Sequence, residues 1–474
     1  MRCVAWFAPS AAALLVAMIY TAFAQAAEKP NVIVILVDDM GYADVGFNGC
    51  KDIPTPNIDR IAKEGIRFSE GYVSHPFCSP TRAGLMTGRY QQRFGHENNP
   101  KYDPHDESYG LPTDEILLPR VLNEAGYATG LVGKWHLGAH PQFHPMQRGF
   151  TEMYGFLGGG HDYFKTQLEG EPKEYLIPIH RDGKPEAFEG YLTDALSREA
   201  VAFVERHTKD PFFLYLAYNA PHTPLQAPEE YLNRFRSISN EKRRTYAAMV
   251  SAVDDGVGKL LAALNQAGLD ERTLIFFFSD NGGPIGERSN GSDNTPLRQG
   301  KGSVYEGGFR VPFAMRWTGT LAAGKEYNHP VVSLDVFPTA AALAGAKLPE
   351  GRTIDGVNLM PYLLGKNQGR PHEVLFWRSG GGPTGAVRAG DQKLARPAGS
   401  DWQLYDLEND ISETSDLAAE KPAVVAELQK QYEQWDAQLI QPVFEGLRDP
   451  RPGQKAKPAA GGKQAKKKAK QSAE

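Results

Sequence analysis

The chain has 474 residues, of which 41% are hydrophobic, and its formal net charge is −5 at pH 7. This length and hydrophobic content suit one large domain with a smaller one, and after the N-terminal segment no stretch is apolar for long enough to span a membrane. Residues 451–474 hold eight basic side chains against one acidic side chain, so the rest of the chain is acidic and we expect no nucleic-acid partner.

The N-terminus predicts export. An apolar run from Ala11 to Ala24 is followed by Gln25-Ala26 and then by a polar change at Glu28. About 14 apolar residues are too few to cross a bilayer, and they fit a secretory signal peptide that is cut near Ala26. We therefore expect residues 1–26 to be a signal peptide and the mature protein to be periplasmic or extracellular. A membrane anchor is the alternative.

Strand-like and helix-like segments alternate from Asn31 onward. Asn31 to Val37 is a continuous apolar run of the kind that a parallel sheet buries on both faces. A short helix follows, capped by Asn57 and ended by Gly65. The pattern then predicts helices over Asp114–Ala125, Leu192–His207 and Glu241–Ala267, and strands over Tyr127–Gly133, Phe212–Tyr218 and Thr273–Phe278. Such alternation predicts an α/β fold with a mostly parallel sheet between two layers of helices.

The pattern changes after Gly369. Short alternating strands are expected at Val374–Trp377, Ala386–Ala389 and Gln403–Leu407, and an amphipathic helix at Pro422–Leu439. These elements predict a small α+β domain with an antiparallel sheet. We place the large catalytic domain at residues 27–368, the small domain at 369–448 and a disordered basic tail at 449–474. Loose adhesion of this tail to anionic glycans or a cell surface is the alternative to simple solvation.

Acidic residues follow two of the predicted strands. Asp38 and Asp39 come after the first strand, and Asp280 and Asn281 come after the strand that ends at Phe278. Ligands of open α/β sheets bind just outside the carboxyl ends of the strands. Three carboxylates and an amide carbonyl are hard oxygen ligands, so we expect a divalent cation there, calcium or magnesium rather than zinc. A simple turn at Asp280–Gly283 is the alternative.

Cys78 stands out in a chain that has three cysteines. Cys3 leaves with the signal peptide, so the exported chain keeps Cys50 and Cys78, which could pair, although a domain of this size needs no disulfide. Pro80 suits the first turn of a helix, so Cys78 lies at or just before a helix N-terminus, where anions are favoured. Arg82 adds a guanidinium that suits an oxyanion.

Further cationic groups are expected near the strand ends. Lys134 and His136 are two residues apart and would project to the same side of an extended segment. His222 follows the strand that ends at Tyr218, and Lys301 lies between two glycines. Each of these side chains alone could be structural or solvated, and their common position beside strand ends marks them as candidates.

These motifs resemble the type I sulfatases. The segment Cys78-Ser79-Pro80-Thr81-Arg82, with Thr87-Gly88-Arg89, is similar to the first signature of that family, and Gly126–Gly130 through Gly133–Gly138 is similar to the second. The remaining family blocks match, in order, at Asp38-Asp39, Pro221-His222, Ser279–Gly282 and Lys301 before Tyr305–Gly308. The resemblance covers roughly residues 30–440, and Thr81 stands where serine is commoner. It implies an alkaline-phosphatase-like fold, with a large mixed sheet sandwiched by helices.

The resemblance also implies a mechanism. A maturation enzyme would oxidise Cys78 to formylglycine (3-oxoalanine), whose hydrate is the nucleophile. Arg82 would steady the hydrate, and His136 would be the base of the later elimination. The sulfate would be bound by Lys134, His222 and Lys301, with His222 or Lys301 protonating the leaving alcohol. The expected metal ion is calcium, with magnesium as the second choice. It would be held by Asp38, Asp39, Asp280, Asn281 and the modified Cys78.

The substrate is expected to be a sulfated carbohydrate. Gly138–Pro145 with Arg148–Phe150 resembles N-acetylgalactosamine-6-sulfatase and related carbohydrate sulfatases, and Gly158–Tyr163 resembles bacterial enzymes that act on polysaccharides. We expect a sulfated galactose or galactosamine unit, with aryl sulfates as surrogate substrates. The residues predicted to bond sugar hydroxyls are His96, Glu97, His161 and Asp162, for which solvent-facing loops are the alternative.

Two other functions fit the same residues. A phosphatase or phosphonate hydrolase of the same fold would use a similar anion pocket with metal and arginine. A non-catalytic protein that binds sulfated glycans would leave Cys78 as an unmodified thiol. The chemical state of Cys78 and the preferred ester separate these alternatives.

Overall fold

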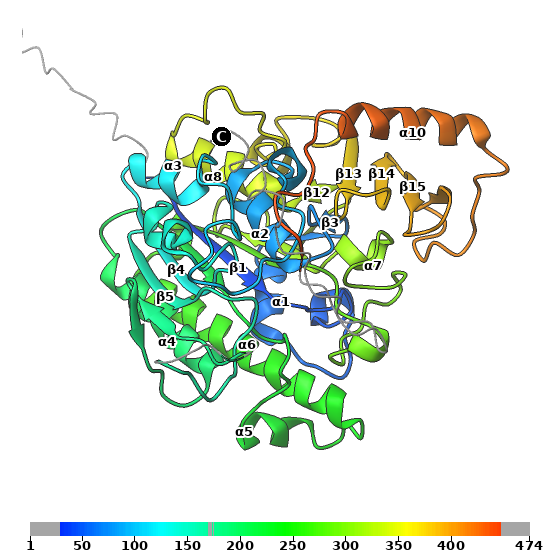
Figure 1. Cartoon of the computed structure of the whole chain (residues 1–474). Helices are drawn as coiled ribbons and strands as arrows, with labels where there is room; N and C mark the ends of the chain where they lie inside the picture. Colours follow the sequence, from blue (N-terminus) through cyan, green and yellow to red (C-terminus); the bar gives the residue numbers. More distant parts are fainter. Residues whose placement is uncertain (1–28, 169–172, 174, 447–474) are drawn as a thin grey trace, which may run out of the picture.

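The computed structural model describes residues 29–168, 173 and 175–446, so the predicted signal peptide and the whole of the predicted basic tail lie outside the described residues. Its main feature is a ten-stranded mixed sheet in the order β11-β2-β10-β9-β1-β8-β4-β5-β6-β7 (Figure 1). The strands are β1 Asn31–Val37, β2 Ile66–Phe68, β4 Ala128–Lys134, β5 Glu152–Phe156, β6 Ile179–Arg181, β7 Lys184–Glu186, β8 Phe212–Ala217, β9 Thr273–Ser279, β10 Phe313–Arg316 and β11 Lys325–Tyr327.

Helices cover both faces of this sheet, which confirms the predicted fold class (Figure 1). Those of the large domain are α1 Pro56–Lys63, α2 Cys78–Thr87, α3 Leu118–Glu124, α4 Leu192–Arg206, α5 Glu229–Leu232, α6 Glu241–Gln266, α7 Glu306–Phe309, α8 Val336–Ala344 and α9 Met360–Leu363. Two short strands, β3 Gly71–Tyr72 and β12 Val331–Val332, pair separately. Within the described part of the chain, no helix is both long and apolar enough to cross a membrane.

The central strand β1 explains why the sheet is covered on both sides. It pairs in parallel with β8 and with β9, and all seven of its residues are buried. Its side chains alternate between two cores: Val34 and Leu36 pack with α2, α3 and α8, whereas Ile33 and Ile35 pack with α1, α4 and α6. A continuous apolar run is therefore the pattern that this position requires.

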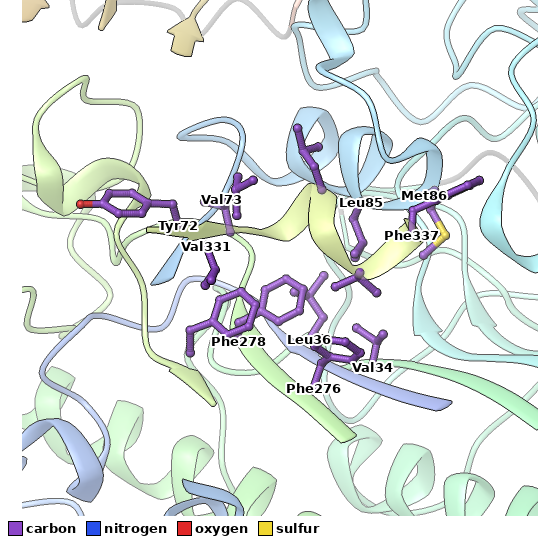
Figure 2. Close-up of a cluster of buried hydrophobic side chains, with 14 of the residues drawn as sticks. Val34, Leu36, Tyr72, Val73, Leu85, Met86, Phe276, Phe278, Val331 and Phe337 are labelled. Atoms are coloured by element: carbon purple, nitrogen blue, oxygen red, sulfur yellow. The ribbon is translucent and has the colours of Figure 1, made fainter. Parts of the chain in front are cut away.

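The first of these cores fixes the position of α2. Leu85 and Met86 of α2 meet Phe337 of α8 above the strands β1 and β9 (Figure 2). The strand side chains beneath them in Figure 2 are Val34, Leu36, Phe276 and Phe278. All ten residues of α2 are buried, so this helix is held firmly against the sheet, with its first residue at the sheet's carboxyl edge.

The small C-terminal unit is an antiparallel sheet with one helix, as expected. Its strands are β13 Val374–Arg378, β14 Gly385–Ala389, β15 Gln392–Arg396 and β16 Gln403–Asp406, and its helix is α10 Pro422–Asp436. It meets the large domain through buried charges. Lys393 of β15 donates to Glu306 of α7 at 2.9 Å and to Glu413 at 2.7 Å, and all three side chains are fully buried.

Two predicted helix starts differ from the structure. The first helix begins at Pro56 with Thr55 at its N-cap, not Asn57, because the Asp254 carboxylate of α6 accepts the backbone N–H groups at the helix start. The helix predicted from Asp114 begins at Leu118. Proline suits the first turn, and Pro119 marks it there.

Candidate active site

Four neighbouring parallel strands end at one edge of the main sheet, and predicted site residues follow each of them. The order β9-β1-β8-β4 brings together the segments that carry Asp280, Asp38, His222 and His136. Because β1 and β9 pair in register up to their last residues, Asp38 and Asp280 stand side by side. The position agrees with the general rule that ligands bind beyond the carboxyl ends of parallel strands.

Three carboxylates and a thiol crowd into this edge. One ligand atom from each of Asp38, Asp39, Asp280 and Cys78 lies within 4.8 Å of the other three, and all four side chains are buried. Burial and the Asp38 carboxylate raise the pKa of Asp280 to about 6. Burial also opposes the ionisation of Asp38, but the Lys134 ammonium and further cations outweigh it and lower its pKa. Carboxylates so close repel one another, so the cluster needs positive charge.

The donor set fits a divalent cation with oxygen ligands. Asn281 Nδ2 donates to Asp39 Oδ1 at 2.7 Å, while Asn281 Oδ1 is buried and has no partner among residues that the structure describes. Rotation of the Asn281 side-chain amide would exchange its nitrogen and oxygen and place the oxygen beside Asp39. There it could bind a cation that prefers oxygen ligands. Together with Asp38 and Asp280, these two residues are the ones that would hold calcium or magnesium.

Cys78 begins α2 and is 1% exposed. Its Sγ lies 3.4 Å from Asp38 Oδ1 and 3.1 Å from Lys301 Nζ. Burial and the Asp38 carboxylate raise the pKa of the thiol, so it stays protonated. Because the thiolate is the nucleophilic form, unmodified Cys78 is poorly suited to attack an ester. Cys50 is half-buried elsewhere, and both thiols are free.

Arg82 ties the start of α2 to the strand ends. Its Nε and Nη2 donate to Asp280 Oδ2 at 3.0 and 2.7 Å, and its Nη1 donates to the Lys134 carbonyl oxygen at 3.0 Å. The side chain is fully buried. It therefore supplies a fixed positive charge between the nucleophile position and the carboxylate cluster.

Two lysines face the carboxylates. Lys134 forms an ion pair with Asp38, and Lys301 Nζ lies 2.6 Å from Asp39 Oδ1. Burial opposes the charge on Lys301, but Asp39 and its neighbours outweigh it and raise the pKa of this lysine well above its usual value. The loop is held by a hydrogen bond from Gly302 N to Pro76 O at 2.9 Å, so Lys301 is fixed in place.

The two histidines predicted to act in catalysis are neutral; His136 is buried and His222 is partly exposed. Burial and the nearby Lys134 lower the pKa of His136 well below its usual value, and within the described ranges neither of its ring nitrogens has a partner. Burial also lowers the pKa of His222, whose Nδ1 donates to the Thr223 carbonyl oxygen at 2.6 Å. His222 thus presents an unprotonated Nε2, which is 3.7 Å from Asp39 Oδ2.

A cavity of about 540 Å³ opens from this group of residues. Its inner end is formed by Cys78, His136, His222 and Lys301. Its outer walls come from three segments, and they are lined by Asn99, Pro100, Tyr102, Asp103, Pro104, His105, Gly158, Gly159, Gly160, Lys173, Tyr175 and Ile177. Sequence reasoning missed most of these wall residues, because single aromatic or polar residues in a loop carry no periodicity. Only the run of three glycines stood out.

The four residues predicted to bond a sugar do not line this cavity. His96 Nε2 lies 2.7 Å from a serine hydroxyl of α2, and Glu97 pairs with Arg378 of β13. His161 contacts two carbonyl oxygens, and Asp162 Oδ1 accepts two backbone N–H groups of the following turn. All four side chains hold loops in place, so we do not propose them as substrate ligands.

Comparison with known proteins agrees with this arrangement. The profile of the family described as Sulfatase matches residues 30–346, and that of the N-sulphoglucosamine sulphohydrolase C-terminal region matches residues 299–438. The chain is 37% identical to the N-acetylgalactosamine-6-sulfatase of Mus musculus over 391 residues, which cover 78% of this chain and 72% of the mouse protein. It is 33% identical to the steryl-sulfatase of Homo sapiens over 440 residues, covering 77% and 74% of the two chains.

A solved structure is similar over most of the chain. The crystal structure of Ps i-CgsB in complex with k-i-k-neocarrahexaose superposes with a TM-score of 0.83 at 47% sequence identity, covering 88% of this chain and 94% of that chain. The Sulfatase profile spans the strands that carry the carboxylate cluster and the helix that begins at Cys78. This chain therefore belongs to the type I sulfatase family and is a sulfuric ester hydrolase.

Proposed function

We propose that this enzyme removes sulfate from a sulfated galactose or galactosamine unit of a polysaccharide or glycosaminoglycan. The observation that carries the proposal is the inner end of the cavity, where the buried Cys78 touches both Asp38 and Lys301. The choice of sugar is supported by the names of two similar proteins, an N-acetylgalactosamine-6-sulfatase and a protein solved in complex with k-i-k-neocarrahexaose.

We further propose that Cys78 is converted to formylglycine by a maturation enzyme and that calcium is the resident cation. Once formed, the hydrated aldehyde supplies a nucleophilic hydroxyl, which the protonated thiol does not. Asp38, Asp39, Asp280 and Asn281 would hold calcium. The buried, unpartnered Asn281 oxygen and the repulsion within the carboxylate cluster support this assignment.

The cations around the inner end would bind the sulfate group. Lys134 and Lys301 supply positive charge from two sides, and Arg82 fixes the orientation of Asp280 behind them. In typical enzymes one preorganised donor of this kind contributes about 3 kcal/mol or more to the stabilisation of the transition state. The group would be held with little reorganisation, because these side chains are already buried and fixed.

Proton transfer can be assigned to separate residues. Lys301 is protonated and its Nζ lies 3.1 Å from Cys78 Sγ, so its position makes it the candidate proton donor to the leaving alcohol. His222 is neutral with its free nitrogen unprotonated, so it serves better as a hydrogen-bond acceptor for substrate. His136 is neutral and unpartnered, and it is the preferred proton acceptor when the aldehyde re-forms.

Mass spectrometry combined with substrate assays tests the proposal. Protein made with a maturation enzyme should give an oxidised Cys78 peptide and release sulfate from sulfated galactan oligosaccharides, while Cys78→Ala should release none and keep its melting temperature. An unmodified thiol in protein from its native host, with no sulfate release, would indicate a glycan-binding protein. Faster cleavage of a phosphate ester than of the matching sulfate ester would indicate a phosphatase or phosphonate hydrolase.

We also propose that the protein is exported and that the domains divide near residue 369. N-terminal sequencing of the mature protein should begin close to residue 27. Limited proteolysis should first cleave the chain outside residues 27–368 and 369–448, because both domains are compact and share buried contacts.

A further inference from the structure

Three consecutive glycines, Gly158–Gly160, form part of the cavity wall, and we call them the glycine strip. None of the three has a positive φ, so the backbone conformation itself would accept other residues. Glycine is required there because of what lies opposite each position. The strip therefore lets the side chains around the cavity pack directly against its backbone, and it does not make a turn.

The inner part of the strip faces the two histidines of the reaction centre. A Cβ on Gly159 would lie 2.7 Å from His136 Nε2, and a Cβ on Gly160 would lie 3.4 Å from His222 Cε1. Any side chain at Gly159 would thus displace the ring of His136. The strip begins where the sulfate group would be held.

The outer part of the strip faces two tyrosines. A Cβ on Gly158 would lie 3.3 Å from Tyr102 Cδ2, and a Cβ on Gly160 would lie 2.6 Å from Tyr175 Cε1. Both tyrosines are partly exposed and line the cavity. The ring of Tyr175 is also 6.5 Å from the ring of His222, so the aromatic walls continue directly from the reaction centre.

The strip also offers backbone groups for hydrogen bonding. Its N–H and C=O groups form no hydrogen bonds with other described residues, although Gly158 and Gly160 are buried. Buried backbone groups are nearly always paired with protein, water or ligand. Asn99 adds a donor at the same wall: its Oδ1 accepts from Ser79 N at 3.0 Å, which leaves its amide hydrogens for a ligand.

A pyranose ring satisfies both features. Its hydroxyl groups can pair with the backbone of the strip, and its C–H face can lie against a tyrosine ring. A flat aromatic or steroid ring would use the tyrosines but would leave the backbone groups unpaired. We propose that the glycine strip, Tyr102 and Tyr175 form the subsite for the sugar ring that carries the sulfate ester. This inference rests on the proposed function.

Binding in an inactive background tests the subsite without any need for conversion of Cys78. In Cys78→Ala protein, calorimetry would measure the Kd of k-i-k-neocarrahexaose. Tyr102→Leu and Gly158→Ala should each weaken binding about tenfold. The first removes the aromatic face, and the second places a Cβ 2.7 Å from Ile177 Cδ1 and 3.3 Å from Tyr102 Cδ2, which displaces this wall of the cavity. Tyr109→Leu is the matched control, because Tyr109 packs on Phe444 and does not line the cavity.

Turnover by the converted enzyme gives the second readout. Tyr102→Leu should raise KM for the hexasaccharide about tenfold, while the inhibition constant of inorganic sulfate, which has no ring to contact the tyrosines, stays within about threefold of wild type. An unchanged KM and Kd in both variants would overturn the subsite while leaving the sulfatase function intact. Equal weakening of hexasaccharide and inorganic sulfate binding would also overturn it, because the change would then act on the reaction centre and not on a subsite for the sugar ring. If wild type cleaves an aryl sulfate ester but neither binds nor cleaves the hexasaccharide, the proposed sugar substrate fails as well.

Discussion

At the scale of single residues, the oxygen atoms of the carboxylate cluster determine the dependence on metal. Asp38, Asp39 and Asp280 are buried together, and the Asn281 oxygen beside them lacks a partner within the described structure. A cation that binds only the folded state stabilises it by about 2.7 kcal/mol at a concentration one hundred times its Kd.

We therefore predict that removal of metal by a chelator lowers both sulfate release and the melting temperature, and that added calcium restores them. Asn281→Leu should weaken this response to calcium, because it keeps the size of the side chain and removes the oxygen. Asn367→Leu, at an exposed position, should respond like wild type. Purified protein without calcium or magnesium, and with no thermal shift on adding either, would contradict the assignment.

The buried side chain of His75 leads to a second prediction at the scale of single residues, which is that the folded protein loses stability in acid. The ring is fully buried just before α2, and neither nitrogen has a partner in the described part of the chain. Burial, with His96 and Arg378, lowers the pKa of His75 from 6.5 to about 3, and burial lowers that of His96 to about 3 as well. In the unfolded chain both rings take up protons near pH 6.5, whereas the folded protein resists until about pH 3.

The stability that these rings contribute is therefore complete above pH 6.5 and is lost as the pH falls toward 3. Each pH unit in this window costs about 1.4 kcal/mol per histidine. His75→Phe should flatten the pH dependence of the urea midpoint between pH 7 and pH 5, and His105→Phe, at an exposed ring, should leave it as in wild type. Parallel slopes for His75→Phe and wild type would refute this explanation.

The sequence could predict the motif residues of the site but not its wall. Asp38, Asp280 and His222 follow long buried strands, and the ends of parallel strands meet at one edge. The ion pair of Glu97 could not be predicted in this way, because its partner Arg378 lies 281 residues away in the sequence. A polar loop residue has the same local sequence whether it faces sugar or a buried arginine.

At the scale of elements, strand β4 depends on glycine at one position. Gly133 has φ +113°, and a Cβ there would lie 1.9 Å from the Ala217 carbonyl oxygen of the neighbouring strand β8. Gly126, at the start of the same segment, has φ +86°. A Cβ at this position would have no atom of the described structure within 4 Å outside its chain neighbours. The two glycines share the conformation and differ in the space beside them.

This pair gives a matched test. Gly126→Ala should cost about 1–2 kcal/mol, the price of a left-handed alanine. Gly133→Ala should cost about 3 kcal/mol or more, since it must also push β4 away from β8. Gly133→Ala should also lower the specific activity of the protein that remains folded, because Lys134 is the next residue in the chain. Denaturant melts and specific activities would measure both effects, and equal costs for the two variants would argue against the clash.

Helices and strands could be predicted where burial requires a long, regular pattern of apolar residues. Asn31–Val37 and Thr273–Ser279 are continuous apolar strands of seven residues, and both were expected within one residue. The strands β2 and β10 have three and four residues, too few for a period to show. Their place in the sheet is set by tertiary packing.

At the scale of the whole molecule, buried charges join the small domain to the large one. Lys393 is fully buried between Glu306 and Glu413, and Arg388 reaches Tyr72 of β3. Burial opposes the charge on Glu306, but Lys393 and its neighbours lower the pKa of this carboxyl to about 2. The Lys393 ammonium is therefore the cation that joins the two carboxylates, and arginines on both sides of the interface support it.

We predict that Lys393→Met destabilises the protein by about 3–5 kcal/mol, because it leaves Glu413 buried without its cation and leaves Glu306 with Arg310 alone as its ion-pair partner among the described residues. The two domains should still unfold in one transition, as the interface is shared. Lys430→Met, at an exposed position on α10, should stay within about 0.5 kcal/mol of wild type. Calorimetry would show the difference, and an early separate transition of the small domain would contradict the coupling.

The central place of β1 has a consequence for synthesis. Residues 31–37 leave the ribosome first, but their partners in the sheet begin at Phe212 and Thr273. At about 5–20 residues per second, this apolar strand waits on the order of ten seconds or more without neighbours. During that interval it is open to aggregation and needs protection. The same delay is when Cys78, 1% exposed after folding, can be reached by another enzyme.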